Sequence, residues 1–186
     1  LDRPTTPRRV HAFSLPGFGT TGRTRSNAEA LGRALGARLE TVDITRSCRA
    51  HLRDLAHTGE EDVVFENVQA RYRTELLFNK ANETGALVVG TGDLTEIALG
   101  WCTFSGDHLS HYHVNASVPK TLVRYLVRWV ADEEEAGSST QRWLHDVLDT
   151  PISPELRRPA NGEVTQKTED IIGPVELADF YLYPFI

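Results

Sequence analysis

The 186-residue sequence contains no methionine and only two cysteines, and it has no long apolar run. Cys48 and Cys102 lie far apart in unlike contexts, which argues against a disulfide framework and against a Cys-x-x-Cys zinc site. No apolar stretch approaches the length of a membrane span, and no secretory signal opens the chain. We therefore expect a cytoplasmic protein that has no membrane partner.

The sequence also has no excess of basic residues. The 20 Lys and Arg residues are dispersed among 26 Asp and Glu residues, and the formal net charge is −6. Domains that bind nucleic acid usually present a basic face, so a nucleic-acid partner is not expected. Hydrophobic residues make up 40% and charged residues 25%, which is typical of one globular domain with its own core.

Short apolar runs alternate with helical stripes along the chain. The expected strands are residues 10–15, 39–44 and 86–89. One expected helix begins at Ser26, and two more cover residues 45–56 and 62–83. Another begins after a Ser117 cap, and a last one includes residues 143–148. Residues 1–9 are interpreted as a linker, and the chain is expected to be irregular after residue 150. The alternation predicts an α/β fold with a parallel sheet flanked by helices, whose ligands bind beyond the carboxyl ends of the strands.

A literal Gly-x-G-x-x-Gly motif, Gly17 to Gly22, follows the first expected strand. Asp43 lies about 20 residues further on, where a ribose-binding acid belongs, so a Rossmann-type NAD(P)-dependent oxidoreductase is one alternative. A capping box of Ser26 and Glu29 would, however, start the helix four residues after Gly22, too late for the third glycine to help helix and strand pack. A flexible Gly/Thr loop is the preferred interpretation.

The segment Gly90-Thr-Gly-Asp93 is a better candidate for a ligand-binding site than the Gly17–Gly22 loop. An apolar run ends there at the start of a helix, where free N–H groups and the helix dipole attract anions. Thr91 adds a hydroxyl, and Glu96 stands one turn into the helix, where a carboxylate could hold Mg²⁺. Asp93 and Glu96 could equally form a capping box that needs no ligand, and the pattern alone leaves both interpretations open.

Several segments together resemble the synthetase domain of glutamine-dependent NAD synthetases. They run in the family's order and cover nearly the whole chain. They are Leu15-Pro-Gly-Phe18, residues 65–71 (FENVQAR), 90–101 (GTGDLTEIALGW), 110–115 (SHYHVN), 118–121 (VPKT), 148–156 (LDTPISPEL), 172–174 (IGP) and Asp179-Phe180. The resemblance implies a Rossmann-like three-layer fold of the adenine-nucleotide alpha-hydrolase kind, within the ATP-pyrophosphatase family.

The resemblance implies ATP-dependent amidation of deamido-NAD to NAD. An acyl-adenylate forms, pyrophosphate and AMP are released, and ammonia comes from glutamine hydrolysed by another domain. No side chain is implied as a catalytic acid or base, because positioning and neutralisation of phosphate charge by Mg²⁺ and cations suffice. A homo-oligomer is also implied, at least a dimer through the helix at 62–83.

Site residues follow from the same resemblance. The implied ATP-binding residues are Leu15, Thr91, Lys120 and Ser153. The implied deamido-NAD-binding residues are Asn67, Arg71, Glu96, Trp101, Cys102, Thr103, Phe104 and Asp107, and Glu96 is also the implied metal ligand. By pattern alone Asn67 and Arg71 could be an ordinary polar helix face, Trp101 a core residue, and Ser153 a turn residue.

Three histidines, His108, His111 and His113, crowd one loop with Asp107 and Cys102. Imidazole and thiolate suit Zn²⁺, but the spacing matches no standard zinc pattern. Because the resemblance implies a substrate-binding loop here, a zinc site is not expected.

The chain departs from the family pattern in what it does not contain. The Ser-Gly-Gly-x-Asp-Ser phosphate loop, the glutaminase domain with its cysteine nucleophile, and a further C-terminal segment are missing, and the loop at 57–61 is short. We expect one incomplete synthetase domain from a longer protein, with little activity by itself. A non-catalytic nucleotide-binding domain and an ATP-pyrophosphatase that amidates a different nucleotide are also compatible with the sequence.

Overall fold

The computed structural model describes residues 10–153, 156–158 and 167–185. Its strands in this part of the chain are β1 (His11–Ser14), β2 (Arg38–Thr41), β3 (Val89–Asp93) and β4 (Tyr112–Asn115). Strand β1 pairs in parallel with β2, and β3 pairs in parallel with β4. The predicted parallel α/β class is confirmed, although the described strands form two two-stranded sheets where one continuous sheet was expected. The expected linker at 1–9 lies outside the described residues.

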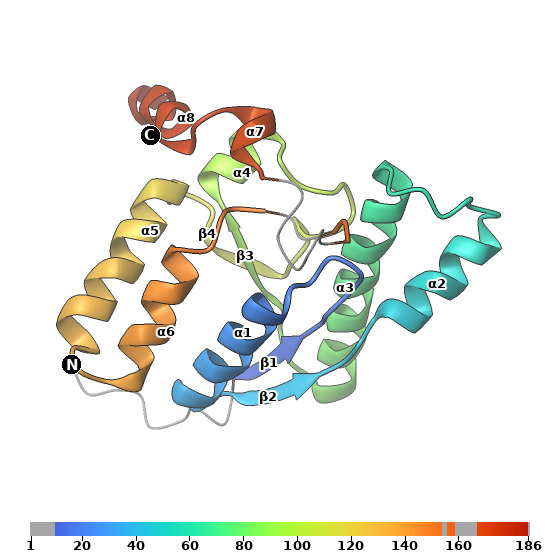
Figure 1. The fold of residues 1–186 in the computed structure, drawn as a ribbon, viewed down its shortest axis with the longest axis horizontal. Coiled ribbons are helices and arrows are strands. Elements are labelled where there is room, and N and C mark those ends of the chain that lie inside the picture. The colour runs from blue at the N-terminus through green and yellow to red at the C-terminus, as the bar shows by residue number, and fades with distance from the viewer. Residues whose placement is uncertain (1–9, 154–155, 159–166, 186) are drawn as a thin grey trace.

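Helices surround these strands (Figure 1). They are α1 (Gly22–Ala34), α2 (Thr45–Asp54), α3 (Val63–Thr84), α4 (Leu94–Leu99), α5 (Lys120–Trp129), α6 (Ser139–Leu148), α7 (Glu169–Ile172) and α8 (Val175–Leu182). A π-helical turn (Val130–Glu134) follows α5, and a 3-10 turn (Tyr183–Phe185) follows α8. Helices α5 and α6 lie on one side of the strands and α2 and α3 on the other, with α1 packed against α6. None of the described helices is long and apolar enough to cross a membrane.

Helix α3 has the extent that its sequence pattern predicts. The Asp62 carboxylate accepts hydrogen bonds from the N–H groups of Val64 and Phe65, each 3.0 Å long, and so caps the helix. These backbone N–H groups, with the neighbouring His57, hold the pKa of the Asp62 carboxyl below its ordinary value despite some desolvation. Gly85 ends the helix in the left-handed conformation, at φ 64°, which glycine adopts without strain.

The described core lies between α2 and α3. Its buried members are Ile44, Cys48, Leu52, Phe65 and Val68, and Leu15, Phe18 and Tyr72 pack against them. Burial raises the pKa of the Cys48 thiol to about 11, so this cysteine behaves as a small apolar residue. The core therefore joins the segment after β1 to the N-terminal half of α3.

The predicted start of α1 at Ser26 is wrong. The helix begins at Gly22, because the hydroxyl of Thr21 accepts a hydrogen bond from the Thr24 N–H at 3.2 Å and acts as the N-cap. Glu29 binds arginines on its own helix and forms no capping box. The argument that Gly22 precedes the helix by four residues is therefore also wrong.

Three further expectations differ from the structure. Residues Gly90 to Gly92 belong to β3 and do not form a turn after it, and β4 occupies part of the expected His-rich loop. Helix α5 has Pro119 as its N-cap residue, so the expected Ser117 cap is wrong. The expected irregular stretch after residue 150 contains α7 and α8, and α8 begins after Pro174, a residue that suits a helix start.

Candidate functional site

The candidate site centres on the junction between β3 and α4. Asp93 is the N-cap of α4, and its carboxylate accepts a hydrogen bond from the Glu96 N–H at 3.0 Å. Oε2 of Glu96 accepts one in return from the Asp93 N–H at 3.2 Å, which completes a capping box. The structural role that the sequence allowed for these two acids is thus confirmed.

Lys120, the first residue of α5, brings a cation to the same two acids. Its Nζ lies 2.5 Å from Oδ2 of Asp93 and 2.8 Å from Oε1 of Glu96, and only 14% of its side chain is exposed. Burial by itself would lower the pKa of Lys120, but the hydrogen bonds and charges of Asp93 and Glu96 outweigh burial and raise it. Lys120 is therefore a largely buried, doubly paired ammonium and not a solvated first-turn lysine.

The ends of α4 and α5 are joined by further hydrogen bonds. The Thr95 hydroxyl, beside Glu96 in sequence, accepts a hydrogen bond from the Lys120 N–H at 2.8 Å and donates one to the Asp179 carboxylate. Asp179 also accepts from the Thr121 N–H at 2.8 Å. The N-termini of two helices consequently meet at one point, which concentrates positive dipole ends beside Lys120.

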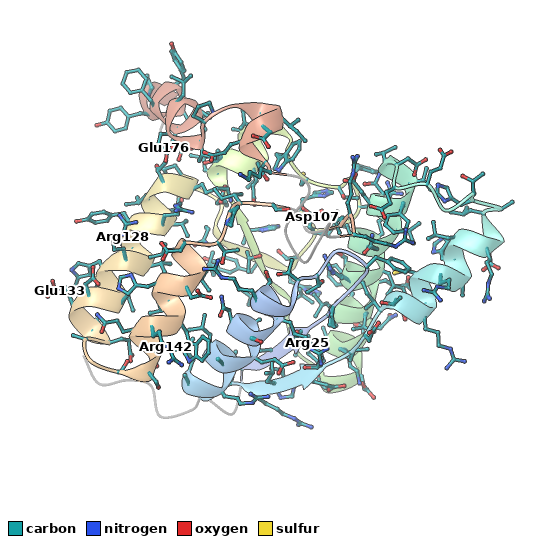
Figure 2. All side chains as sticks on the ribbon, in the orientation of Figure 1. Arg25, Asp107, Arg128, Glu133, Arg142 and Glu176 are labelled. Atoms are coloured by element: carbon teal, nitrogen blue, oxygen red, sulfur yellow. The ribbon has the colours of Figure 1, made fainter. Side chains whose placement is uncertain are left out.

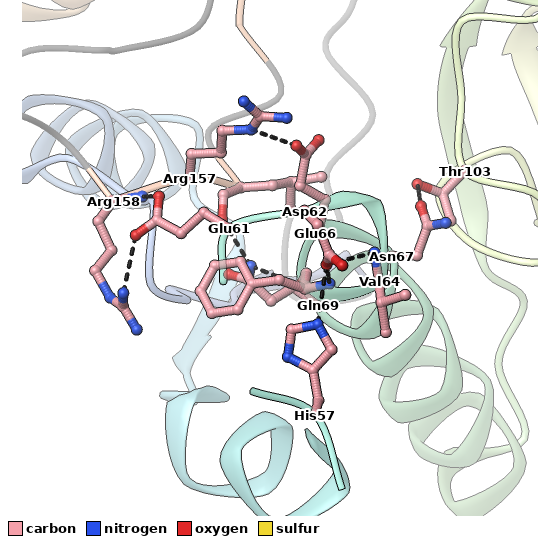
Figure 3. Close-up of polar contacts among 12 residues, drawn as sticks. His57, Glu61, Asp62, Val64, Glu66, Asn67, Gln69, Thr103, Arg157 and Arg158 are labelled. Atoms are coloured by element: carbon pink, nitrogen blue, oxygen red, sulfur yellow. Dashed lines mark hydrogen bonds and ion pairs between the residues drawn. The ribbon is translucent and has the colours of Figure 1, made fainter. Parts of the chain in front are cut away.

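The loop after α4 is attached to α3 (Figure 3). The Thr103 hydroxyl donates to Oδ1 of Asn67 at 3.0 Å, and Nε of Arg71 donates to the Phe104 carbonyl at 3.0 Å. Oδ1 of Asp107 accepts from the Thr103 N–H at 2.8 Å and closes the loop on itself. Five of the sequence-predicted residues therefore lie together, and Asn67 and Arg71 are loop anchors in addition to being polar residues of a helix face.

The side chains of Phe104 and Cys102 in this loop are open to solvent. Phe104 is 78% exposed and Cys102 is exposed, whereas Trp101 is half-buried. Partial burial, and then the negative charges of Asp107 and Glu96, raise the pKa of the Cys102 thiol. The loop thus presents an aromatic ring and a protonated thiol at its surface.

The three histidines hold this region together. Nδ1 of His108 lies 2.8 Å from the Thr103 carbonyl, and Nε2 of His113 lies 2.8 Å from the His108 carbonyl, so these nitrogens carry protons. Nδ1 of His111 accepts from the Val88 N–H at 3.0 Å. Within the described ranges no three His, Cys, Asp or Glu side chains are grouped to hold a metal ion.

Gly90 lies directly against this histidine cluster. A Cβ atom at Gly90 would be 2.5 Å from both Nδ1 of His113 and Oγ of Ser110, far inside contact distance. Only glycine therefore allows β3 to approach the 108–113 segment this closely.

The loop after β1 is closed by hydrogen bonds within the protein. The Gly17 N–H donates to the Thr20 hydroxyl at 3.1 Å, and the Phe18 N–H donates to Oε1 of Gln69 at 3.0 Å. Arg73 donates to the Leu15 carbonyl at 3.1 Å. Two N–H groups that a dinucleotide pyrophosphate would need are therefore already engaged, and the loop is held in place.

Gln69 is a residue that the sequence interpretation missed. It is fully buried on α3, and its amide also donates to the Leu156 carbonyl at 2.7 Å (Figure 3). The segment 156–158 is held to the same helix end by ion pairs from Arg157 to Glu66 and from Arg158 to Glu61. A polar residue inside the apolar stripe of α3, between Phe65 and Tyr72, was the signal that could have revealed it.

Comparison with known proteins identifies the family. The sequence model of the NAD synthase family matches residues 4–137, well over half of the chain. This chain belongs to the NAD synthase family.

Relatives within the family extend the match to almost the whole chain. The glutamine-dependent NAD(+) synthetases of Mycobacterium bovis and Mycobacterium tuberculosis are 48% identical over 98% of this chain. The protein of that name from Rhodobacter capsulatus is 32% identical over 93% of this chain. The chain spans 28% of the length of the mycobacterial relatives.

Solved structures agree on the NAD synthase fold. An NMN synthetase from Francisella tularensis has a TM-score of 0.78 at 22% identity, covering 94% of this chain and 66% of its own. A glutamine-dependent NAD+ synthetase from Acinetobacter baumannii, solved with adenosine diphosphate, has a TM-score of 0.67 at 28% identity, covering 78% of this chain and 27% of its own. The match to this family, and the engaged N–H groups after β1, argue against a dehydrogenase.

The NAD synthase site residues expected from sequence fall into separate groups. Glu96 and Lys120 meet at the junction of α4 and α5, and Thr103 and Phe104 of the 101–107 loop contact Asn67 and Arg71 on α3. Thr91 is exposed on β3, and Leu15 contacts the core from the β1 side. Ser153 is half-buried after α6. Asp179, like Gln69, had no role predicted from sequence, and its contact with Thr95 spans 84 positions.

Proposed function

We propose that this chain is the nucleotide-binding part of an enzyme that amidates deamido-NAD to NAD with ATP. An acyl-adenylate forms on the nicotinate carboxylate, pyrophosphate leaves, and ammonia attacks to release NAD and AMP. The observation that carries the proposal is the group formed by Lys120, Asp93 and Glu96 at the N-termini of α4 and α5. It supplies charge of both signs beside helix ends that attract phosphate, within a chain of the NAD synthase family.

ATP is proposed to bind at this end of β3. Lys120 would pair with the phosphates, and the exposed Thr91 hydroxyl would donate to them. Leu15 and Ser153 would complete the ATP site from the β1 loop and the segment after α6. The ADP-bound relative from Acinetobacter baumannii supports nucleotide binding by a domain of this fold.

Mg²⁺ would be held by Glu96, together with Asp93. The donor set fits, because two carboxylate oxygens already face one cation, the Lys120 ammonium, at 2.5 and 2.8 Å, and Mg²⁺ prefers oxygen ligands. When bound, Mg²⁺ supplies neutralisation of the phosphate charge. Lys120 would then exchange its carboxylate partners for phosphate oxygens.

Deamido-NAD is proposed to bind along the 101–107 loop. Phe104 and Trp101 offer aromatic surface, while Thr103, Cys102 and Asp107 offer polar groups around it. Asn67 and Arg71 anchor this loop from α3 and would contact the dinucleotide as well. Glu96 would face both substrates from the neighbouring helix.

The remaining partners are proposed for the longer protein. Its ammonia would come from glutamine, and its site would be completed by a second copy that packs on α3. Because the expected phosphate loop is not within these 186 residues, we propose little or no turnover for this chain by itself. Positioning of the two substrates would supply most of the rate enhancement.

The test is NAD formation by the full-length protein from ATP, deamido-NAD and ammonium. Lys120→Met and Glu96→Gln should each lower kcat/KM by about 100-fold or more, as loss of a group that stabilises developing charge does. Lys167→Met, at an exposed lysine before α7, is the matched control and should behave as wild type. Unchanged turnover in both site variants would favour a non-catalytic nucleotide-binding domain.

Substrate competition distinguishes deamido-NAD from a different nucleotide substrate. An ATP-pyrophosphatase that amidates a purine nucleotide would turn over that nucleotide and ignore deamido-NAD. Formation of AMP only when deamido-NAD is present would support the proposed substrate.

A further inference from the structure

Helix α5 has no N-terminal cap of its own. Its N-cap residue is Pro119, which carries no side-chain hydrogen-bonding group. The first N–H groups of a helix have no partner within the helix and must be satisfied from elsewhere. Here the Lys120 N–H donates to the Thr95 hydroxyl, and the Thr121 N–H donates to the Asp179 carboxylate.

Asp179 comes from α8, at the far end of the described chain. Its carboxylate is buried, with 7% of the residue exposed, and it also accepts the Thr95 hydroxyl proton. No Lys or Arg within the described ranges forms an ion pair with it. Burial of an unpaired carboxylate is costly, so its hydrogen bonds and the positive end of α5 have to stabilise it.

These contacts fix the geometry of the proposed ATP site. Thr95 precedes Glu96 in sequence, and the Thr95 hydroxyl accepts a hydrogen bond from the backbone N–H of Lys120. Asp179 holds both the Thr95 hydroxyl and the next N–H of α5. Besides the direct ion pair of Lys120 with Glu96, the start of α5 is therefore held against α4 by one carboxylate that touches neither side chain.

Resting on the proposed function, we propose that Asp179 is a positioning residue that holds Lys120 and Glu96 in their relative places. It acts as a cap that α8 donates to α5. Helix α8 is thus a part of the nucleotide site without contacting the nucleotide.

The test compares Asp179→Asn and Thr95→Val with Glu176→Gln in the full-length protein. Glu176 is an exposed carboxylate on α8, one turn before Asp179, and serves as the matched control (Figure 2). Asp179→Asn loses one acceptor and the charge, whereas Thr95→Val loses the hydroxyl with little change in shape. Thr95→Val keeps the test possible if Asp179→Asn does not fold. Kinetics with ATP and deamido-NAD, and the rate at which an amine-acetylating reagent modifies Lys120, are the two readouts.

We expect kcat/KM for ATP to fall about tenfold in both variants, as for loss of a hydrogen bond to a charged group. Lys120 should be acetylated faster than in the wild type, and Glu176→Gln should change neither readout. A lower melting temperature with wild-type ATP kinetics and wild-type acetylation would overturn the proposal. If the wild-type protein made no NAD, the proposed function would fail, and the acetylation rate would still test the positioning role.

Discussion

The ammonium of Lys120 lies 2.8 Å from Oε1 of Glu96, a contact between residues 24 positions apart on two different helices. Asp93 binds the same ammonium and is itself buried. The three side chains form one charged unit in which each member makes burial of the others tolerable. Stability and ligand binding therefore depend on the same atoms, and the predictions begin there.

Removal of the Lys120 charge should destabilise the fold. Lys120→Met leaves Asp93 and Glu96 facing each other without a cation, and we expect a loss of about 3 kcal/mol in the free energy of unfolding, measured by urea denaturation. The triple variant Lys120→Met, Asp93→Asn, Glu96→Gln keeps both capping residues neutral and should regain most of that loss, but not ATP binding. A single variant as stable as the wild type would contradict this account.

High pH should weaken the same unit. The pKa of Lys120 is raised in the folded protein, so its contribution to stability is complete below the unfolded value of about 10.4. That contribution is lost as pH rises through the folded pKa. Urea midpoints from pH 8 to 11 should fall more steeply for the wild type than for the triple variant, and parallel curves would contradict the prediction.

Gly90 should tolerate no larger residue. Gly90→Ala places a methyl group 2.5 Å from His113 and Ser110, and His113 is held by the His108 carbonyl, so the strand or the loop must shift. We expect a loss of about 1–3 kcal/mol, measured by thermal and urea unfolding. Gly22→Ala, in open space at the start of α1, is the control and should lose no stability. Equal stability of the two variants would refute the close approach.

The two thiols should differ in reactivity. Cys48, buried and with a pKa of about 11, should react with iodoacetamide only after unfolding. Cys102 is exposed, but its raised pKa reduces the thiolate fraction near neutral pH, so its alkylation should be slow and should accelerate as pH rises. Asp107→Asn removes one negative neighbour and should speed alkylation at pH 7. The measurement is the alkylation rate by mass spectrometry, with Cys102→Ser as the control, and a slower rate in Asp107→Asn would contradict the assigned cause.

Acid should loosen the start of α3. The folded pKa of Asp62 is depressed, first by the Phe65 N–H, so its contribution is present above the unfolded pKa of about 3.9. That contribution disappears as pH falls through the folded pKa. Asp62→Ala should melt at a lower temperature at pH 7, whereas Asp62→Asn keeps a cap and should lose only the acid dependence. Circular-dichroism melts from pH 3 to 7 would check both variants. Identical pH profiles of the wild type and Asp62→Asn would contradict the prediction that the Asp62 charge stabilises the helix start.

Local patterns predicted α3 and β1 well, placed β2 and β3 only in part, and missed β4. The apolar stripe of α3, its Asp62 cap and the terminal Gly85 belong to one continuous stretch of sequence. The helical period of its apolar residues therefore reveals the helix. Strand β4 exposes Tyr112 and Val114 and is defined by its pairing with β3, which no local pattern encodes. Ser26 and Glu29 have capping-box spacing, but the same spacing occurs within any helix.

The candidate site was likewise predictable only where its residues are neighbours in sequence. Glu96 could be singled out because it stands at the start of a helix after an apolar run. The contacts that decide its chemistry come from Lys120 and, through Thr95, from Asp179, at separations of 24 and 84 positions. Sequence order alone does not reveal which distant side chains meet. The resemblance to a family supplied a role for Lys120, whereas it included Asp179 in a matching segment without a role.

Helix α3 is about 33 Å long, as its 22 residues require, yet its links to the β1 loop, the 101–107 loop and the 156–158 segment all lie between Glu66 and Arg73. The remaining three turns pack elsewhere on the protein: the Phe78 ring contacts the His111 ring, with centroids 4.9 Å apart, and Ala81 is buried. A tilt of the helix would therefore move the β1 loop, the 101–107 loop and the 156–158 segment together. Strain introduced at one of these three attachments would be transmitted to the other two through a single rod.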